Sequence, residues 1–159
     1  MVTSRVPAAV AALLDILRAA PSLADSVHIE DGPTAVNLTD NDRVYVGWQP
    51  NSEAAVNLQQ DFNAAGARTR DESFIINCYA ESRAGDKDMS LRRNRVFEIL
   101  AVVEDALRAT DAAPTAPTLN GTVLWAHLTA GDLHQEQREG SIAGLNFQVS
   151  CFARLTQSP

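Results

Sequence analysis

The residues best suited to chemistry lie near the C-terminus, in the stretch "HQEQREG" at 134–140. His134 and Glu136 are two positions apart, so on a strand they share one face, and Arg138 is next on that face. A carboxylate that orients an imidazole is a common arrangement for a general base. The neighbourhood offers no nucleophile and no metal-ligand spacing. The pattern therefore favours a solvated hairpin arm over a catalytic site.

The other histidines and both cysteines are expected to pack rather than react. His127 follows Trp125 on one face of a predicted strand, and His28 lies on a separate strand. Cys78 and Cys151 each fall in the middle of a strand on its apolar face, where reduced cysteine behaves as a small hydrophobe. The chain has no "GxSxG", "CxxC" or phosphate-binding glycine motif. We expect no enzyme activity, catalytic residue, cofactor or bound metal.

The charge balance is acidic, with a formal net charge of −7. This balance argues against nucleic acid as a tightly bound partner, because duplex affinity comes mainly from Lys and Arg. An acidic surface does suit a protein past which DNA slides. The only basic cluster is "LRRNR" at 91–95, which is either a solvated helix face or a site of pairing between subunits. The predicted pairs would join Arg92, Arg93 or Arg95 to Asp61, Asp71 or Glu72 of a neighbour.

Hydrophobic periodicity predicts the elements that position these residues. Apolar side chains at helical spacing predict a helix over 3–20, capped by Thr3 or Ser4 with Pro7 in its first turn. A second helix is predicted at about 89–110. Strands are predicted at 26–30, 43–48, 73–81, 122–128, about 132–138 and 142–155, with Gly140 in the turn between the last two.

Alternation within the strands predicts which face each side chain occupies. Val44, Val46 and Trp48 alternate with Tyr45 and are expected on one face. In the last strand, apolar residues from Leu145 to Leu155 alternate with a mixed set: Asn146, Gln148, Ser150, Phe152 and Arg154. The polar segment 49–72 is predicted to be a long interaction loop, although 55–62 has some strand character.

These elements together indicate one α+β domain over residues 1–159. Its sheet is expected to be mostly antiparallel, with the N-terminal and central helices covering one face. The apolar stretch 6–17 is too short to span a bilayer and contains Asp15, so we expect an intracellular protein.

The order of these elements, together with several short stretches, resembles the tail terminator (tail completion) proteins of long-tailed phages. The stretches are "IEDGP", "VYVGW", "ARTRDESFIINCYAES", "GDKDMSLRRNRVFEILAVVEDALRA" and the C-terminal "LNGTVLWAHL" to "SCFARL". The similarity is to the family of the phage lambda tail terminator, especially in actinobacterial phages and prophages, and it covers nearly the whole chain.

The resemblance implies a homohexameric ring at the head-proximal end of the virion tail, assembled in the host cytoplasm. Such a ring stops polymerisation of the major tail tube protein and offers a surface to the head–tail connector, while DNA passes through its lumen without specific binding. Plausible ring contacts are then Tyr79, Gln148, Phe152 and Arg154, and segment 49–72 is expected to be an arm that faces the tube or the lumen.

Two alternatives remain open at this point. A neck or head–tail stopper protein has similar size and ring-forming habit. A small α+β enzyme or ligand-binding module would use His127 or His134 in a pocket between sheet and helices.

Overall fold

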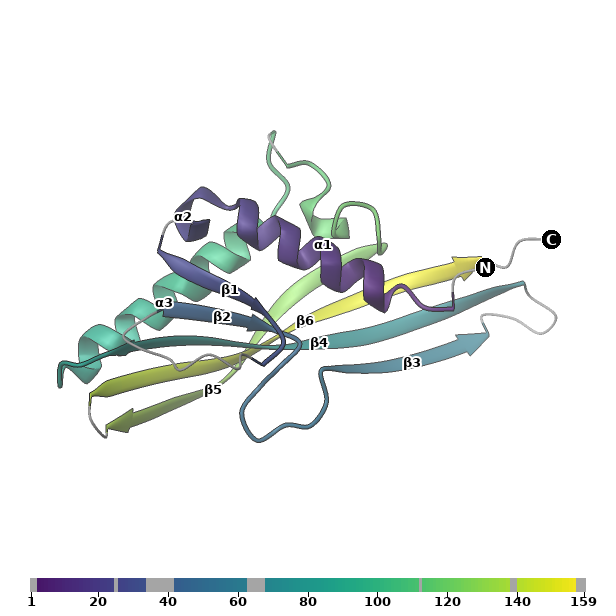
Figure 1. The fold of residues 1–159 in the computed structure, drawn as a ribbon. Coiled ribbons are helices and arrows are strands. Elements are labelled where there is room, and N and C mark those ends of the chain that lie inside the picture. The colour runs from purple at the N-terminus through teal and green to yellow at the C-terminus, as the bar shows by residue number, and fades with distance from the viewer. Residues whose placement is uncertain are drawn as a thin grey trace.

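The structure is a computed structural model and describes residues 3–24, 26–33, 42–62, 68–111, 113–137 and 140–156. Its helices are α1 (Val6–Ala19), α2 (Pro21–Ala24) and α3 (Met89–Ala106), with a short 3₁₀ turn η1 (Ala116–Thr118). Its strands are β1 (Val27–Asp31), β2 (Asp42–Val46), β3 (Val56–Phe62), β4 (Thr69–Ala84), β5 (Trp125–Gln137) and β6 (Ser141–Thr156). The helices lie on one side of the sheet (Figure 1). The predicted α+β class is therefore confirmed.

The six described strands form one sheet in the order β1-β2-β4-β6-β5, and β3 pairs with β4 next to the end of β2. β4 and β6 are the long central pair, joined antiparallel from Thr69–Thr156 to Ala84–Ser141. Only β1 and β2 run parallel. β3 and the adjoining ends of β4 and β6 extend beyond the region that the helices cover (Figure 1). We call the hairpin of β3 with Thr69–Ile76 the arm.

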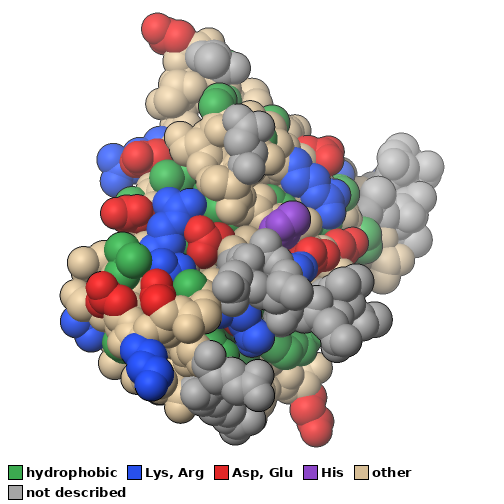
Figure 2. Space-filling view, turned by 60° about the vertical axis from the view of Figure 1, so that its left-hand side comes forward, with side chains coloured by type: hydrophobic (Ala, Val, Ile, Leu, Met, Phe, Trp, Pro, Cys, Tyr) green, Lys and Arg blue, Asp and Glu red, His purple; other side chains and the backbone are tan. Residues whose placement is uncertain are grey.

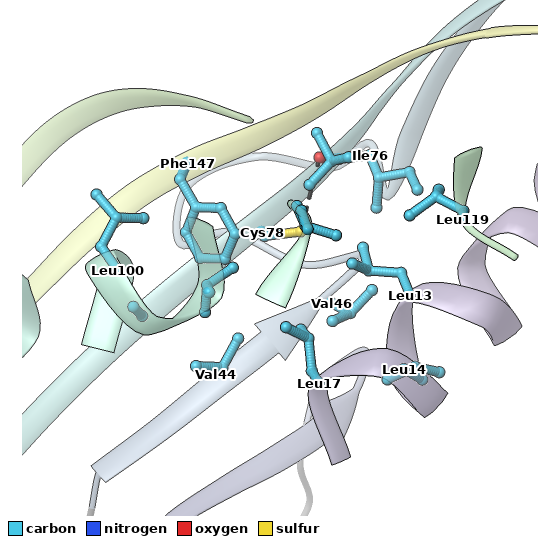
Figure 3. Packing of buried hydrophobic residues seen from close by; sticks show 14 of the residues in the cluster. Leu13, Leu14, Leu17, Val44, Val46, Ile76, Cys78, Leu100, Leu119 and Phe147 are labelled. Carbon is cyan, nitrogen blue, oxygen red and sulfur yellow. Dashed lines mark hydrogen bonds between the residues drawn. The ribbon is translucent and has the colours of Figure 1, made fainter. Parts of the chain in front are cut away.

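The hydrophobic core lies between the helices and one face of the sheet. Leu17 of α1 lies near Val44 and Leu13 near Val46 of β2, and Phe147 of β6 lies beside Leu100 of α3 (Figure 3). All of these side chains are buried. The predicted apolar stripes of both helices therefore face the sheet, as an amphipathic helix requires.

The ends of the two long helices follow local chemistry. The Ser4 hydroxyl accepts the N–H of Val6 at 3.0 Å, and Pro7 lies in the first turn, where no hydrogen-bonding N–H is needed. Asp88 caps α3 by accepting the N–H of Leu91 at 3.1 Å. α3 ends at Ala106, four residues before the predicted end, because the last turn tightens: the N–H of Leu107 bonds to the carbonyl of Glu104.

The segment 49–72 is not the long loop that its polarity predicted. It contains all of β3 and the first four residues of β4, and β3 pairs with Arg70–Ile76 of β4, from Val56–Ile76 to Phe62–Arg70. The sequence of β3, "VNLQQDF", does alternate, with Val56, Leu58 and Phe62 on one face, but the run is short and β3 lies in the arm, where it covers little of the core. Its strand state comes from pairing with β4, which is a tertiary effect.

The predicted strands at 122–128 and 132–138 form a single strand in the structure. β5 begins at Trp125, three residues after the predicted start, and continues to Gln137 with an irregularity between Ala130 and Leu133, where the pairing with β6 shifts. "AGD" at 130–132 therefore makes a bulge instead of a turn. Arg138, the last member of the predicted histidine cluster, lies outside the described residues.

Trp48 lies on the opposite side of the sheet from the predicted one. β2 ends at Val46, and Gly47 adopts a left-handed conformation with φ of +78°, which breaks the alternation. The Trp48 ring consequently packs against Tyr45 and Tyr79, with centroids 4.9 and 5.9 Å away.

Candidate interaction surface

The sheet has one face on which no described helix packs (Figure 1), and we call it the helix-free face. Side chains alternate along β4 and β6, and the register sets Asp71 opposite Arg154, Ser73 opposite Phe152, and Asn77 opposite Gln148. Alternation therefore puts the four predicted ring contacts, Tyr79, Gln148, Phe152 and Arg154, on the helix-free face. Tyr79 is buried, however, at 6% exposure against Tyr45 and Trp48, so its side chain offers little surface for the predicted contact.

An aromatic group is exposed on this face where β5 begins. The Trp125 ring stacks on Phe152 with centroids 5.8 Å apart and an interplanar angle of 11°. His127 also stacks on Trp125, with ring centroids 5.1 Å apart, which confirms that these two residues share a strand face. Trp125 is 46% exposed and the preceding Leu124 is 53% exposed. Large exposed apolar side chains that lie together are typical of interaction sites.

A line of amide side chains crosses the centre of the helix-free face. The Asn77 amide donates to Asn57 of β3 at 2.8 Å and accepts from Gln148 of β6 at 3.1 Å. At the arm, Arg154 donates to Asp71 at 2.8 Å across the same two central strands. These bonds fix the side chains of three neighbouring strands, so the face is ordered before any partner binds.

The basic cluster of α3 lies in the helix layer and is paired within the chain. Arg95 donates to Asp42 at 2.7 Å, and the same carboxylate accepts the Ser82 hydroxyl at 2.7 Å. The hydrogen bond to Asp42 raises the pKa of Arg95 above its usual value. Arg92 donates to Ser82 at 3.1 Å, and Arg93 donates to Gln135 of β5 at 2.9 Å.

The end of the molecule where α3 begins carries both signs of charge. Basic and acidic side chains are intermixed there, without a patch of a single sign (Figure 2). This distribution agrees with a paired helix face, and it weakens the case for Arg92, Arg93 and Arg95 as the main contacts to a neighbouring subunit.

Glu72 corrects one predicted subunit contact. Its side chain is fully buried and accepts hydrogen bonds from Ser4, from the backbone of Arg5 and from Gln60. A buried carboxylate with these partners cannot reach an arginine of another subunit. Of the other two predicted acidic partners, Asp71 already binds Arg154, and Asp61 is exposed on β3.

The arm presents a second apolar group that the sequence analysis did not single out. Leu58 and Phe62 of β3 are 53% and 72% exposed. Both alternate with Gln59 and Asp61 and so point to the helix side of the sheet, where Leu58 pairs with the buried Phe74. The sequence does contain two apolar residues four positions apart, but this spacing indicates a shared exposed face only once β3 is known to be a strand.

The histidines do not converge. His127 and His134 both lie on β5, roughly 20 Å apart at about 3.3 Å per residue. His134 and Glu136 fall on the same face of β5, as predicted, opposite Gly144 and Ile142 of β6. Within the described ranges, no group of three or more His, Cys, Asp or Glu side chains is arranged to hold a metal ion.

Both cysteines are buried free thiols, as predicted. Burial raises the pKa of Cys78 to about 12 and that of Cys151 to about 12. Thiols with such values are protonated at neutral pH and are poor nucleophiles.

An open hollow of about 640 Å³ lies in the helix layer, between α1–α2 and the end of α3. Its lining includes Ile16, Val102, Asp105 and Arg108. Neither His127 nor His134 lines it, so the predicted pocket with a histidine between sheet and helices is not found there.

No protein-family model matches the chain, and no curated protein matches it significantly. None of the helices in the described ranges is long and apolar enough to cross a membrane.

Proposed function

We propose that this protein is a structural assembly protein that acts as a phage tail terminator. It forms a ring of six copies on the last ring of the tail tube, stops tube polymerisation and provides the surface to which the head–tail connector binds. The role needs shape and self-association, and it needs no catalytic group.

The observation that best supports the proposal is the pair of exposed apolar groups at separate places on one sheet. Leu58 and Phe62 belong to the arm, whereas Leu124 and Trp125 lie at the start of β5. A ring requires head-to-tail contacts, in which one patch of a subunit meets a different patch of the next. Each copy carries exposed apolar side chains at two separate places on its sheet, as contacts with two different neighbours require, and the sequence resemblance supplies the particular role.

The test is to add the purified protein to its tail tube protein during polymerisation and to examine the tubes by electron microscopy. The proposal expects tubes that carry a ring at one end and stop growing. Tubes that grow unchanged at saturating protein, with no added density at either end, would overturn it.

A head–tail stopper is the nearest alternative within assembly. It also forms rings, but it binds the connector and not the tube. Binding of the isolated protein to tube ends therefore separates the two roles. A gene for the major tail protein immediately downstream would favour the terminator.

A ligand-binding module is the alternative from another class. The hollow between α1–α2 and α3 is the observation that favours it, since it combines apolar lining with Asp105 and Arg108. A small molecule that raises the Tm in a thermal-shift screen by binding in this hollow, on a protein that stays monomeric, would support the ligand-binding function.

A further inference from the structure

The part of the sheet that carries the arm ends in two strand edges on opposite sides. The register pairs Leu58 of β3 with Phe74, Phe74 with Cys151, and Cys151 with Ala126 of β5. One row of residues thus crosses β3, β4, β6 and β5. Within the described part of the chain, no strand pairs with the outer edge of β3 or of β5.

Both edges lack proline and basic side chains, two features that normally help to prevent pairing with another chain. Monomeric proteins protect edge strands with lysine, proline, short length or a cover. β3 and the first half of β5, Trp125–Ala130, contain no proline, lysine or arginine. The third edge strand, β1, is short and is covered in part, because Arg18 donates to its Ile29 carbonyl at 3.4 Å.

We propose that β3 of one copy pairs with residues 125–130 of β5 in the next copy, so that one sheet continues from subunit to subunit. This inference rests on the proposed ring function and names the contact that would build the ring. The partner that fits an exposed strand edge is another strand, which supplies backbone hydrogen bonds.

Strand direction agrees with this arrangement. β3 is antiparallel to β4, β4 to β6, and β6 to β5. β3 and β5 therefore run in opposite directions. A second copy in the same orientation sets its β3 antiparallel to β5 of the first, and all helices stay on the same side of the continued sheet.

The side chains of the two edges also match. On the helix side, Leu58 and Phe62 would lie beside the partly buried Ala126 and Leu128. Their apolar surface would then be removed from water. On the helix-free face, the polar residues of β3 would continue the row that ends with His127.

The lengths of the two strands and the charges along β5 both favour the first half of β5 as the partner of β3. β3 has seven residues, and β5 has six residues before the irregularity that begins after Ala130. The second half of β5 carries Asp132 and Glu136, whose negative charges would repel the negative charge of Asp61 on β3. The first half carries no carboxylate.

A head-to-tail contact between β3 and β5 leaves neither of these two strand edges unpaired in any copy. Symmetric pairing of β5 with β5 would leave Leu58 and Phe62 exposed, and symmetric pairing of β3 with β3 would leave the edge of β5 unpaired. Repeated β3–β5 contacts cover both edges, and they close into a ring where the rotation from copy to copy adds up to a full turn.

The test is disulfide cross-linking of the full chain. We would make the double variants L58C/A126C and L58C/L128C, because a shift of the pairing by two residues would change the neighbour of Leu58. The native cysteines are buried and should not react in the folded protein. Mild oxidation should give a covalent ladder on a denaturing gel that ends at six chains.

The controls are the single variants and L58C/L91C, whose second cysteine is more accessible than position 126 or 128 but lies on α3, since Leu91 is 49% exposed. These should give no ladder. Dimers from A126C alone or from L58C alone would overturn the head-to-tail contact in favour of a symmetric one.

The solution mass of the wild-type protein separates the two proposals. A six-copy mass together with no ladder in either double variant would overturn the β3–β5 contact and leave the ring intact. A single-chain mass at every concentration, with no ladder, would overturn both.

Discussion

The carboxylate of Glu72 accepts the backbone N–H of Arg5 at 2.8 Å and ties β4 to the start of α1. Its second oxygen accepts the Ser4 hydroxyl at 2.6 Å and the Gln60 amide of β3 at 2.6 Å. One buried side chain thus joins the helix layer, the central strand and the arm. Its negative charge also lies at the positive end of the α1 dipole, where it is favourable.

Removing this carboxylate should destabilise the fold. We expect Glu72→Ala to lower the free energy of unfolding by about 2–3 kcal/mol, because buried donors lose a charged acceptor. In a chain of this size that corresponds to a fall in Tm of roughly 4–12 °C. The matched control is Glu53→Ala, since Glu53 is exposed and should change stability by no more than about 0.5 kcal/mol. Equal effects of the two substitutions, measured by urea unfolding, would contradict the role of Glu72.

Gly144 provides the space for the Tyr79 ring. A Cβ at Gly144 would lie 1.7 Å from the Tyr79 hydroxyl and 2.3 Å from the ring carbon that bears it. We expect Gly144→Ala to cost about 1–3 kcal/mol, because the buried ring must move. The clash depends on the ring, so the cost should shrink in a Tyr79→Ala background, and a double-mutant cycle measures the coupling. Simple additivity would show that the glycine is required for another reason.

The Arg95–Asp42 pair should contribute to stability, not to assembly. It is partly buried and connects α3 to β2, so Arg95→Ala should cost about 1–2 kcal/mol. Arg108→Ala is the control just after the same helix, because the Arg108–Glu104 pair is exposed to solvent and should contribute little to stability. If Arg95 instead belongs to a subunit interface, its variant would change the oligomeric mass while leaving the unfolding curve unchanged.

The buried thiols should make the protein sensitive to alkaline pH. Burial raises the pKa of Cys78 and of Cys151 from 9.0 to about 12, so the folded state holds protons that the unfolded state releases. This contribution is complete below pH 9 and is lost as the pH rises from about 9 towards 12. Burial raises the pKa of Tyr45 to about 12 as well, which adds to the same loss.

Two measurements check this prediction. The free energy of unfolding should be steady around pH 8 and fall above pH 9. A thiol reagent at pH 8 should label neither cysteine until urea unfolds the chain. Rapid labelling of the folded protein would contradict the burial of both thiols.

The sequence predicted the elements whose own side chains build the core. β6 has an uninterrupted alternation from Leu145 to Leu155, and α1 and α3 have clear apolar stripes. The buried face of each element can therefore be predicted from its own sequence. β3 was predicted as part of a loop because the surrounding residues are polar and small and its side chains bury little. The irregularity in β5 was predicted as a turn because a glycine beside an aspartate suits both.

The candidate surface was harder to predict than the fold. Alternation alone assigned Gln148, Phe152 and Arg154 to one face, since they share a strand. The partners of Arg95 and Glu72 come from distant segments, so residue type suggested intersubunit pairs where the structure has intrachain ones. The apolar arm residues needed the strand state and register of β3, which are set by tertiary contacts.

The most direct test of the central claim is the mass of the free protein by light scattering over a concentration series, on material free of nucleic acid. The account predicts a species of about six times the 17.1 kDa of one chain, or a concentration-dependent rise towards it. A mass of one chain at every concentration would contradict self-association through the two sheet edges.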